Sequence, residues 1–295
     1  MTATIIDGRV IAAELRVNLA GEVSELASTG VTPGLAVVLV GDDPGSVSYV
    51  TAKAAACAEI GIFSKTIRLP ATISQQELLE RIAALNADNR FHAILQQLPL
   101  SEHLDERAVL DAIEPAKDVD GLHPSNLGRL LLGETSGPIP CTPKGVMHLI
   151  ARSGIDPAGA HAVVVGRSSL VGRPLAVLLA NKASGANATV TLCHTGTTDL
   201  AAHTRTADIL VVAAGCPNTV TGDMVKPGAT VIDVGTNRID DASRKRGWRL
   251  IGDVDFDSVA DVAGNITKVP GGVGPMTIAM LLENTVRAAR LANLR

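Results

Sequence analysis

Two stretches of the chain carry residues whose type and spacing could support chemistry. In the first, which begins at His161, a short β-branched run from Ala162 to Val165 stops at Gly166, and an apolar helical pattern begins just past Pro174. A glycine turn between a strand and a helix lets backbone N–H groups approach a phosphate, and the helix N-terminus adds partial positive charge. The natural ligand is a dinucleotide. Because Gly172 is the next glycine, the spacing departs from Gly-x-Gly-x-x-Gly, and an ordinary strand-to-helix turn is the alternative.

The surroundings of this turn favour a phosphorylated dinucleotide. The next expected strand, 189–193, ends in His-Thr-Gly-Thr, where an NAD site normally places an acid for the ribose 2′-hydroxyl. No acid is present there, whereas Arg167 lies in the glycine turn and Thr195 follows the strand. Guanidinium and hydroxyl donors suit a 2′-phosphate, which a carboxylate would repel. We therefore expect NADP rather than NAD.

The second stretch lies nearer the N-terminus. Tyr49 and Lys53 stand four residues apart in an alanine-rich helical pattern, so they share one face of the expected helix. This helix follows a buried strand at 34–40, and Ser46 or Ser48 is expected to cap it. A solvated lysine and a core tyrosine are the ordinary alternatives to a functional pair.

Two further polar groups are expected near the carboxyl edge of the same sheet. The strand 93–96 leads into Gln97, and because Pro99 cannot donate to a ladder the strand stops there, with the Gln97 amide at the edge where ligands of α/β sheets bind. A charged loop at 117–121 follows the next helix and contains Asp120.

Apolar runs alternate with helical patterns along the whole chain. Strands are expected at 34–40, 64–69, 93–96, 162–165, 189–193, 208–213, 230–234 and 249–251, and further helices at 9–27, 74–89, 106–113, 146–153 and 277–292. Residues 124–141 are rich in Pro, Gly, Ser and Thr and are expected to connect two domains.

The expected fold class is α/β, with two α/β domains and a cleft between them, the second domain being a Rossmann-like, doubly wound and mostly parallel sheet. We place residues 1–140 and 277–295 in the first domain, because the last helix is expected to pack back against it. Residues 141–276 form the dinucleotide-binding domain. A chain of 295 residues is long enough for two separate cores.

Composition argues against several classes of partner. A net charge of −4 provides no basic field for nucleic acid or anionic membranes. The chain lacks an N-terminal signal pattern and an apolar run of spanning length, so a soluble, cytoplasmic protein is expected. The four cysteines are widely spaced without Cys-x-x-Cys, which predicts reduced thiols rather than a metal site or a disulfide framework.

Six segments are weak signals singly but specific in combination. They are Ser46-Val-Ser-Tyr-Val-Thr-Ala-Lys53, Gln97-Leu-Pro-Leu100, Lys117-Asp-Val-Asp-Gly121, Pro140-Cys-Thr-Pro-Lys-Gly145, Gly166-Arg-Ser-Ser-Leu-Val-Gly172 and Pro270-Gly-Gly-Val-Gly-Pro-Met-Thr277. In this order, and over nearly the whole chain, they resemble the bifunctional methylenetetrahydrofolate dehydrogenase/cyclohydrolase family of the FolD type.

The resemblance implies oxidation of 5,10-methylenetetrahydrofolate to the methenyl form with NADP, followed by hydrolysis to 10-formyltetrahydrofolate, a folate-binding first domain and a homodimer. It implies no metal. Two positions that border the cofactor by analogy depart from the family pattern, because Thr195 stands where Ser is common and Thr236 where Ile is common. Both departures bear on cofactor preference.

The resemblance also implies roles for the polar residues of the first domain. Lys53 is expected to transfer protons as water attacks the cationic methenyl carbon. Tyr49 is expected to stack on the folate or to hydrogen-bond beside Lys53, and Gln97 to contact Lys53. Asp120 is expected to accept two N–H groups from the pterin edge, with Asp118 as the competing candidate.

The remaining expected site residues fall into two sets. The cofactor set is Gly166, Arg167, Ser168, Thr195 and Thr236, and the additional substrate set is Leu98, Gly272, Pro275 and Thr277. The segment 244–249 is strongly basic and is interpreted as a solvated hairpin tip.

Two other functions remain open from the residues. One is an NADP-dependent dehydrogenase of another small substrate, of the shikimate or amino-acid type. The other is a non-catalytic nucleotide sensor, which would have no evident need for the polar residues of the first domain.

Overall fold

The computed structural model describes residues 2–244 and 246–294, which form two compact units. The small-sheet unit contains Ala13–Cys141 and the C-terminal residues from Ile278 onward. The large-sheet unit contains the residues up to Ala12 together with Thr142–Thr277. Most of the C-terminal helix therefore belongs to the small-sheet unit, which is discontinuous in sequence.

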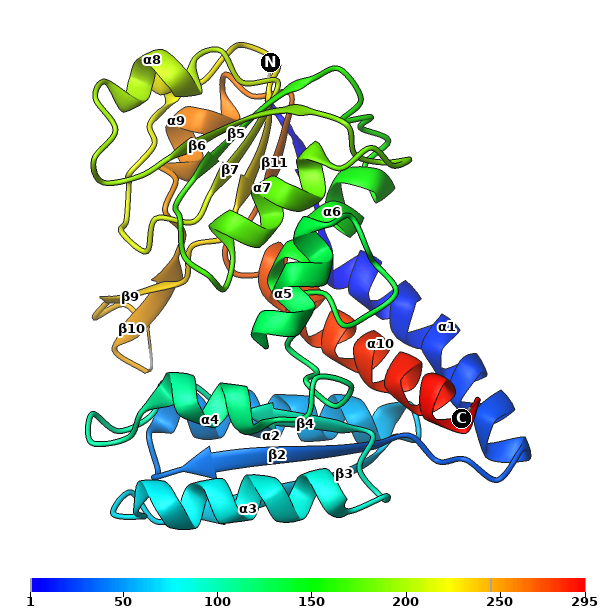
Figure 1. Ribbon diagram of the computed structural model, residues 1–295. Coiled ribbons are helices and arrows are strands. Elements are labelled where there is room, and N and C mark those ends of the chain that lie inside the picture. Colours follow the sequence, from blue (N-terminus) through cyan, green and yellow to red (C-terminus); the bar gives the residue numbers. More distant parts are fainter. Residues whose placement is uncertain (1, 245, 295) are drawn as a thin grey trace. The chain divides into compact units, whose positions relative to one another are not determined.

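The small-sheet unit is built on three parallel strands in the order β3-β2-β4 (Figure 1). The strands are β2 (Gly34–Val40), β3 (Phe63–Leu69) and β4 (Ala93–Gln96). Its helices are α2 (Pro44–Glu59), α3 (Gln75–Ala87), α4 (Glu106–Ala112) and α5 (Pro124–Leu131), together with α1 (Gly8–Ser28) from Ala13 onward and α10 (Val273–Asn293) from Ile278 onward.

Every residue of β2 is buried, because both faces of this central strand are covered. On one face, Val38 packs in a core cluster with Ile82 of α3 and Val109 of α4. Side chains alternate along a strand, so Val37 points to the opposite face, and α2 packs against β2 and β3. This packing fixes α2 at the carboxyl end of β2.

Helix α2 begins earlier than the serine caps suggested. Its N-cap is Asp43, whose Oδ2 accepts a hydrogen bond from Ser46 N at 2.8 Å, and Pro44 occupies the first turn. Aspartate is a good N-cap, and proline loses nothing there because its missing N–H is unused. The expected capping by Ser46 or Ser48 was therefore wrong.

The large-sheet unit contains six parallel strands in the order β1-β11-β8-β7-β5-β6 (Figure 1). They are β1 (Thr4–Ile6), β5 (His161–Val165), β6 (Thr189–Cys193), β7 (Ile209–Val212), β8 (Thr230–Asp233) and β11 (Asn265–Thr267). The helices are α6 (Cys141–Arg152), α7 (Gly172–Ala180), α8 (Leu200–Thr204) and α9 (Phe256–Ala260), with a 3₁₀ turn at Gly222–Met224.

The order of these strands creates a topological switch point. The chain crosses from β5 to β6 in one direction and then returns to β7 on the other side of β5. Loops that leave β5 and β7 therefore diverge at the carboxyl edge, where doubly wound folds bind ligands. One face of the sheet packs in a cluster that includes Val163, Leu210 and Val259 of α9, and α7 packs against β5 and β6.

The strands of this unit differ from the sequence prediction at the hairpin and at one edge of the sheet. The strand expected at 249–251 is β10 (Trp248–Ile251), which pairs only with β9 (Asn237–Asp240) in an antiparallel hairpin outside the sheet. The sheet takes β11 instead, and β1 pairs with β11 in parallel, which places the N-terminal residues in this unit rather than with the rest of 1–140. Strands of three residues give too short an apolar pattern to be recognised.

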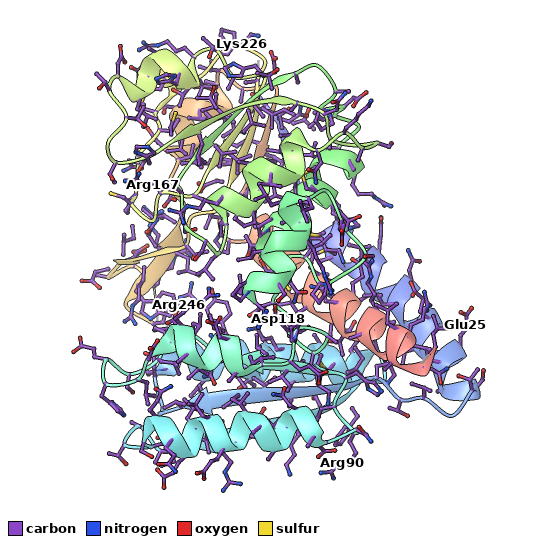
Figure 2. The ribbon with its side chains drawn as sticks, in the orientation of Figure 1. Glu25, Arg90, Asp118, Arg167, Lys226 and Arg246 are labelled. Atoms are coloured by element: carbon purple, nitrogen blue, oxygen red, sulfur yellow. The ribbon has the colours of Figure 1, made fainter. Side chains whose placement is uncertain are left out.

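The basic segment 244–249 covers the turn of the β9–β10 hairpin and the first two residues of β10, Trp248 and Arg249; residue 245 falls outside the described residues. The guanidinium groups of Arg238 and Arg246 lie 4.7 and 4.0 Å from the ring centroid of Trp248. Arg246 is labelled in Figure 2. The interpretation as a hairpin tip is confirmed.

One helix was not expected, and two others start before their expected positions. Helix α5 occupies the front of the segment expected to be a connection, with His123 as N-cap and Pro124 in its first turn. Helix α6 begins at Cys141, and α10 begins at Val273, so it includes part of the Gly- and Pro-rich segment 270–277. Glycine and proline in a first turn cost little, which is why they did not mark the true boundaries.

Within the described residues, no helix is long and apolar enough to span a membrane, and no group of three or more His, Cys, Asp or Glu side chains is arranged to hold a metal ion. The cysteines are free thiols, buried except for Cys216.

Candidate active site

The centre of the candidate site in the small-sheet unit is a contact between Lys53 and Gln97. Lys53 Nζ donates a hydrogen bond to Oε1 of Gln97 at 3.0 Å. Lys53 lies on α2, which follows β2, and Gln97 is the first residue after β4. Because β2 and β4 are parallel neighbours, their carboxyl ends bring these side chains to one sheet edge.

The orientation of the Gln97 amide is set by its surroundings. Its backbone N–H continues the ladder by donating to Val38 O at 2.9 Å. Its side-chain Nε2 donates to Leu98 O at 2.7 Å, which leaves Oε1 to face Lys53. The ammonium group therefore has a fixed direction before any ligand is present.

Asp120 reaches the same edge because its loop pairs with β4. Ile94 N donates to Lys117 O at 2.7 Å and Val119 N to Ile94 O at 3.4 Å, so the loop runs parallel to the strand. The following residue, Gly121, has φ +68°, and a Cβ on it would lie 2.7 Å from the carbonyl carbon of Ile139. Only glycine fits this turn, which directs the chain away immediately after Asp120.

The electrostatics of Asp120 link it to Lys53. Burial raises the pKa of the Asp120 carboxyl above its usual value, the nearby Lys53 charge partly lowers it, and the charge of Asp118 raises it again. A carboxyl group that burial makes costly to ionise gains most from a ligand that brings N–H donors.

Asp118, the competing candidate, is occupied by its own loop. It is buried, and its Oδ2 accepts hydrogen bonds from His123 N at 2.8 Å and Asn126 Nδ2 at 2.9 Å. Figure 2 labels this residue. Its oxygens organise the start of α5, which favours Asp120 as the residue open to a ligand.

Tyr49 is not a core tyrosine, because half of its surface (50%) is exposed. It lies one helical turn before Lys53 on α2. Leu98, which follows Gln97, is partly buried. An exposed phenol ring one turn from the ammonium group is suited to stack on a flat heterocycle.

The glycine turn of the large-sheet unit has the geometry of a phosphate site. Gly166 has φ +125°, and a Cβ on it would lie 2.1 Å from Ala213 O. A Cβ on Gly172 would lie 1.9 Å from Gly166 O. These close approaches keep the turn tight at the switch point, and Val171 at the start of α7 makes no side-chain cap. The turn therefore fits a dinucleotide phosphate.

The side chains around this turn are largely exposed. Arg167 is exposed on the turn (Figure 2), and Ser168 Oγ accepts a hydrogen bond from Val171 N at 3.1 Å. Thr195 is exposed after β6 and Thr236 after β8. Their donors fit the phosphate groups of NADP.

Arg173, which the sequence analysis did not select, is exposed in the first turn of α7. A cation is unfavourable at a helix N-terminus, so its position there was the signal that could have identified it. Asp253 was also missed, and its contacts are described below.

The three expected substrate residues near α10 belong to the large-sheet unit, unlike Lys53. Gly272 N donates to Lys268 O at 2.7 Å. Pro275 lies in the first turn of α10, and the Thr277 and Thr142 hydroxyl oxygens lie 3.1 Å apart. Their expected contact with substrate stays a prediction.

Comparison with protein families gives two matches. Residues 140–293 match the model of the tetrahydrofolate dehydrogenase/cyclohydrolase NAD(P)-binding domain. Residues 6–120 match the model of the catalytic domain of the same family.

Individual relatives match over their full length. The chain is 54% identical to the "Bifunctional protein FolD" of Syntrophus aciditrophicus, covering 99% of both chains. It is 56% identical to that of Moorella thermoacetica, covering 98% of this chain and 100% of the relative. The crystal structure of the Trypanosoma brucei methylenetetrahydrofolate dehydrogenase-cyclohydrolase, complexed with NADP and an inhibitor, superposes with a TM-score of 0.95 at 41% identity and covers 100% of each chain. The chain belongs to the tetrahydrofolate dehydrogenase/cyclohydrolase family.

Proposed function

We propose that this chain catalyses both reactions of its family: NADP-dependent oxidation of 5,10-methylenetetrahydrofolate and hydrolysis of the 5,10-methenyl product to 10-formyltetrahydrofolate. The observation that carries the proposal is the Lys53–Gln97 pair, joined at 3.0 Å, with Asp120 electrostatically coupled to the lysine. The matches of residues 6–120 and 140–293 to the two domain models of the family support the proposal. Neither a dehydrogenase for another substrate nor a nucleotide sensor is favoured by these matches.

Lys53 carries the proton transfers of the hydrolytic step. Water attacks the cationic methenyl carbon and loses one proton. The bond from that carbon to N5 then breaks as N5 gains a proton, and the remaining hydroxyl proton is released to solvent as the formyl C=O forms on N10. An amine next to the substrate can accept the first proton and deliver the second. Gln97 acts as a positioning residue, because its Oε1 fixes the direction of the lysine Nζ.

Asp120 anchors the pterin. An ionised carboxylate accepts the two adjacent N–H groups of the 2-amino-4-oxo pyrimidine edge, and such bidentate contacts fix orientation as well as affinity. Tyr49 stacks on the ring system. Leu98, Gly272, Pro275 and Thr277 complete the expected substrate contacts.

Gly166, Arg167, Ser168, Thr195 and Thr236 would hold NADP, which when bound accepts a hydride from the methylene carbon. The tight turn at Gly166 supports this assignment, because only a turn without side chains lets backbone N–H groups reach a diphosphate. The oxidation needs no acid or base from the protein, so these residues bind and orient.

An assay that follows NADPH and methenyl absorbance together tests the proposal. With methylenetetrahydrofolate and NADP, NADPH is expected to accumulate while methenyl absorbance stays low because hydrolysis removes it. NAD in parallel is expected to give slower turnover. Absence of folate-dependent NADPH formation by the folded protein would reject the dehydrogenase function.

The assembly and location of the protein follow from the family resemblance alone. A homodimer in the cytoplasm is the arrangement we propose. Sedimentation velocity would show a species of twice the chain mass, and a single-chain mass at micromolar concentration would reject the dimer.

A further inference from the structure

Asp253 lies directly after the β9–β10 hairpin and is completely buried in the large-sheet unit. Its Oδ2 accepts hydrogen bonds from Ala214 N at 2.6 Å and Gly215 N at 2.8 Å. Its Oδ1 accepts one from Asn237 Nδ2 at 2.8 Å. The carboxylate thus joins its own segment to two others that are distant in the sequence, the 214–215 loop and the segment of Asn237.

The first of these segments forms a wall of the phosphate turn. Ala214 and Gly215 follow β7, the strand beside β5 at the switch point. Ala213 N donates to Val165 O at 2.7 Å, and Ala213 O is the atom that a Cβ on Gly166 would meet. Asp253 therefore holds the loop against which the glycine turn packs.

The second segment carries an expected cofactor contact. Asn237 is the neighbour of Thr236, and a Cβ on Gly235 would lie 2.3 Å from Asp253 Oδ1. Gly235 N donates to Asp233 Oδ1 at 2.9 Å. Thr236 is exposed, and its two neighbours are each bonded to a buried carboxylate, Gly235 to Asp233 and Asn237 to Asp253.

The chemistry of Asp253 argues against a role in filling the core. Among the described residues Asp253 forms no ion pair, and the hydrogen bonds that its oxygens accept all come from N–H groups. An unpaired buried carboxylate is costly, and an apolar side chain would fill the same space more favourably. Its oxygens do something that an apolar side chain cannot do, which is to fix N–H groups at the carboxyl edge.

We infer that Asp253 is a positioning residue of the dinucleotide site, holding the 214–215 loop and the Thr236 segment in the arrangement that binds NADP. The inference rests on the proposed use of NADP. It assigns no contact with the cofactor to Asp253 itself. Loss of the carboxylate would release both segments while leaving the Lys53 site in the other unit unaltered.

The test is Asp253→Asn in the full chain. The amide has one acceptor, so its NH₂ must face either the backbone N–H groups or Asn237. We expect the Kd for NADP, by calorimetry, and the KM for NADP to rise about tenfold or more, which corresponds to about 1.4 kcal/mol. Hydrolysis of methenyltetrahydrofolate, which uses no NADP, is expected to stay within about twofold of wild type.

Asp208→Asn is the matched control. Asp208 Oδ2 also accepts a backbone hydrogen bond, from His161 N at 2.8 Å, and its Oδ1 pairs with Lys226, which is labelled in Figure 2. Since His161 begins β5, this carboxylate lies at the amino edge of the same sheet. We expect the control to leave the Kd for NADP unchanged.

A double variant provides the rescue. Asp253→Asn with Asn237→Asp exchanges donor and acceptor, so the residue-253 amide oxygen faces the backbone N–H groups and its NH₂ faces the new carboxylate. Part of the NADP affinity is expected to return, although Gly252 O, which now accepts from Asn237 at 3.1 Å, opposes complete recovery.

The outcomes separate the two proposals. A wild-type protein that fails to bind NADP would reject the proposed function. A wild type that binds NADP, with Asp253→Asn no weaker than Asp208→Asn, would overturn the positioning role. If Asp253→Asn does not fold, Asn237→Ser removes the bonds from Asn237 Nδ2 to Asp253 Oδ1 and to Gly252 O, and it keeps the bonds from Ala214 N and Gly215 N to Asp253 Oδ2. A several-fold rise in the Kd for NADP then supports the inference, and an unchanged Kd overturns it.

Discussion

Lys53 Nζ and Gln97 Oε1 lie 3.0 Å apart, although 44 residues separate them in the chain. The contact exists because two parallel strands end at the same edge: Gln97 directly follows β4, and Lys53 lies on the helix α2 that follows β2. Gln97→Leu removes the acceptor and keeps a similar volume. We expect hydrolysis to fall about tenfold or more while the Kd for NADP stays unchanged, measured by methenyl absorbance and calorimetry. Equal loss of both would mean that Gln97 only supports the fold.

Asp120 is expected to make folate affinity depend on pH. Its pKa is raised by burial, so the ionised acceptor is lost at a higher pH than for an ordinary aspartate as pH falls. The KM for both folate substrates is therefore expected to rise on acidification, and Asp120→Ala to raise it at every pH and flatten the profile. If Asp120→Ala instead weakens NADP binding and leaves folate affinity intact, Asp120 belongs to the cofactor site and not to the folate site.

Gly166→Ala is expected to separate the two activities. The new Cβ would lie 2.1 Å from Ala213 O at a φ of +125°, so the turn must open. Dehydrogenase turnover is expected to fall about a hundredfold or more at moderate NADP, with hydrolysis retained. Gly159→Ala is a suitable control, since it also has positive φ but has open space around it. A Gly166→Ala protein with wild-type NADP affinity would contradict the assignment of the turn.

Asp233 is expected to make stability depend on pH. Burial raises its pKa to about 6 from 3.8, despite N–H donors from Asp253, Val254 and Gly235. The folded protein therefore binds this proton more tightly than the unfolded chain. The stabilisation is fully present below about pH 4 and is lost as pH rises to about 6, by about 3 kcal/mol.

Urea unfolding of wild type and Asp233→Asn across that pH range measures this effect. The stability advantage of wild type over the variant is expected to shrink as pH rises. An advantage that grows with pH would show that the N–H donors outweigh burial and lower the pKa of Asp233 instead.

Much of the fold could be predicted because its strands are short apolar runs between breakers. β2, β4 and β6 have the expected bounds, since Gly34–Val40 and its counterparts are apolar stretches next to turn residues. β1 and β11 were missed because three residues carry no periodicity. The first turn of α10 was hidden by Gly274 and Pro275, which resemble a loop in composition.

The residues of the candidate sites also fall into those that the sequence predicts and those that it does not. Gln97 directly follows an expected strand, Lys53 lies on the expected helix after another strand, and Asp120 lies in a charged loop, so their position at the sheet edge could be inferred. Asp253 could not, because its contacts with Gly215 and Asn237 depend on how a hairpin returns to the sheet edge. A lone aspartate after a glycine carries no signal of that kind.

The central claim is that Lys53 carries out the hydrolytic proton transfers, and Lys53→Met tests it most directly. Methionine keeps an unbranched side chain of similar length without the amine. In a variant that retains the wild-type melting temperature and NADP affinity, we expect methenyltetrahydrofolate hydrolysis to fall to the uncatalysed rate. Hydrolysis at the wild-type rate in that folded variant would contradict the account.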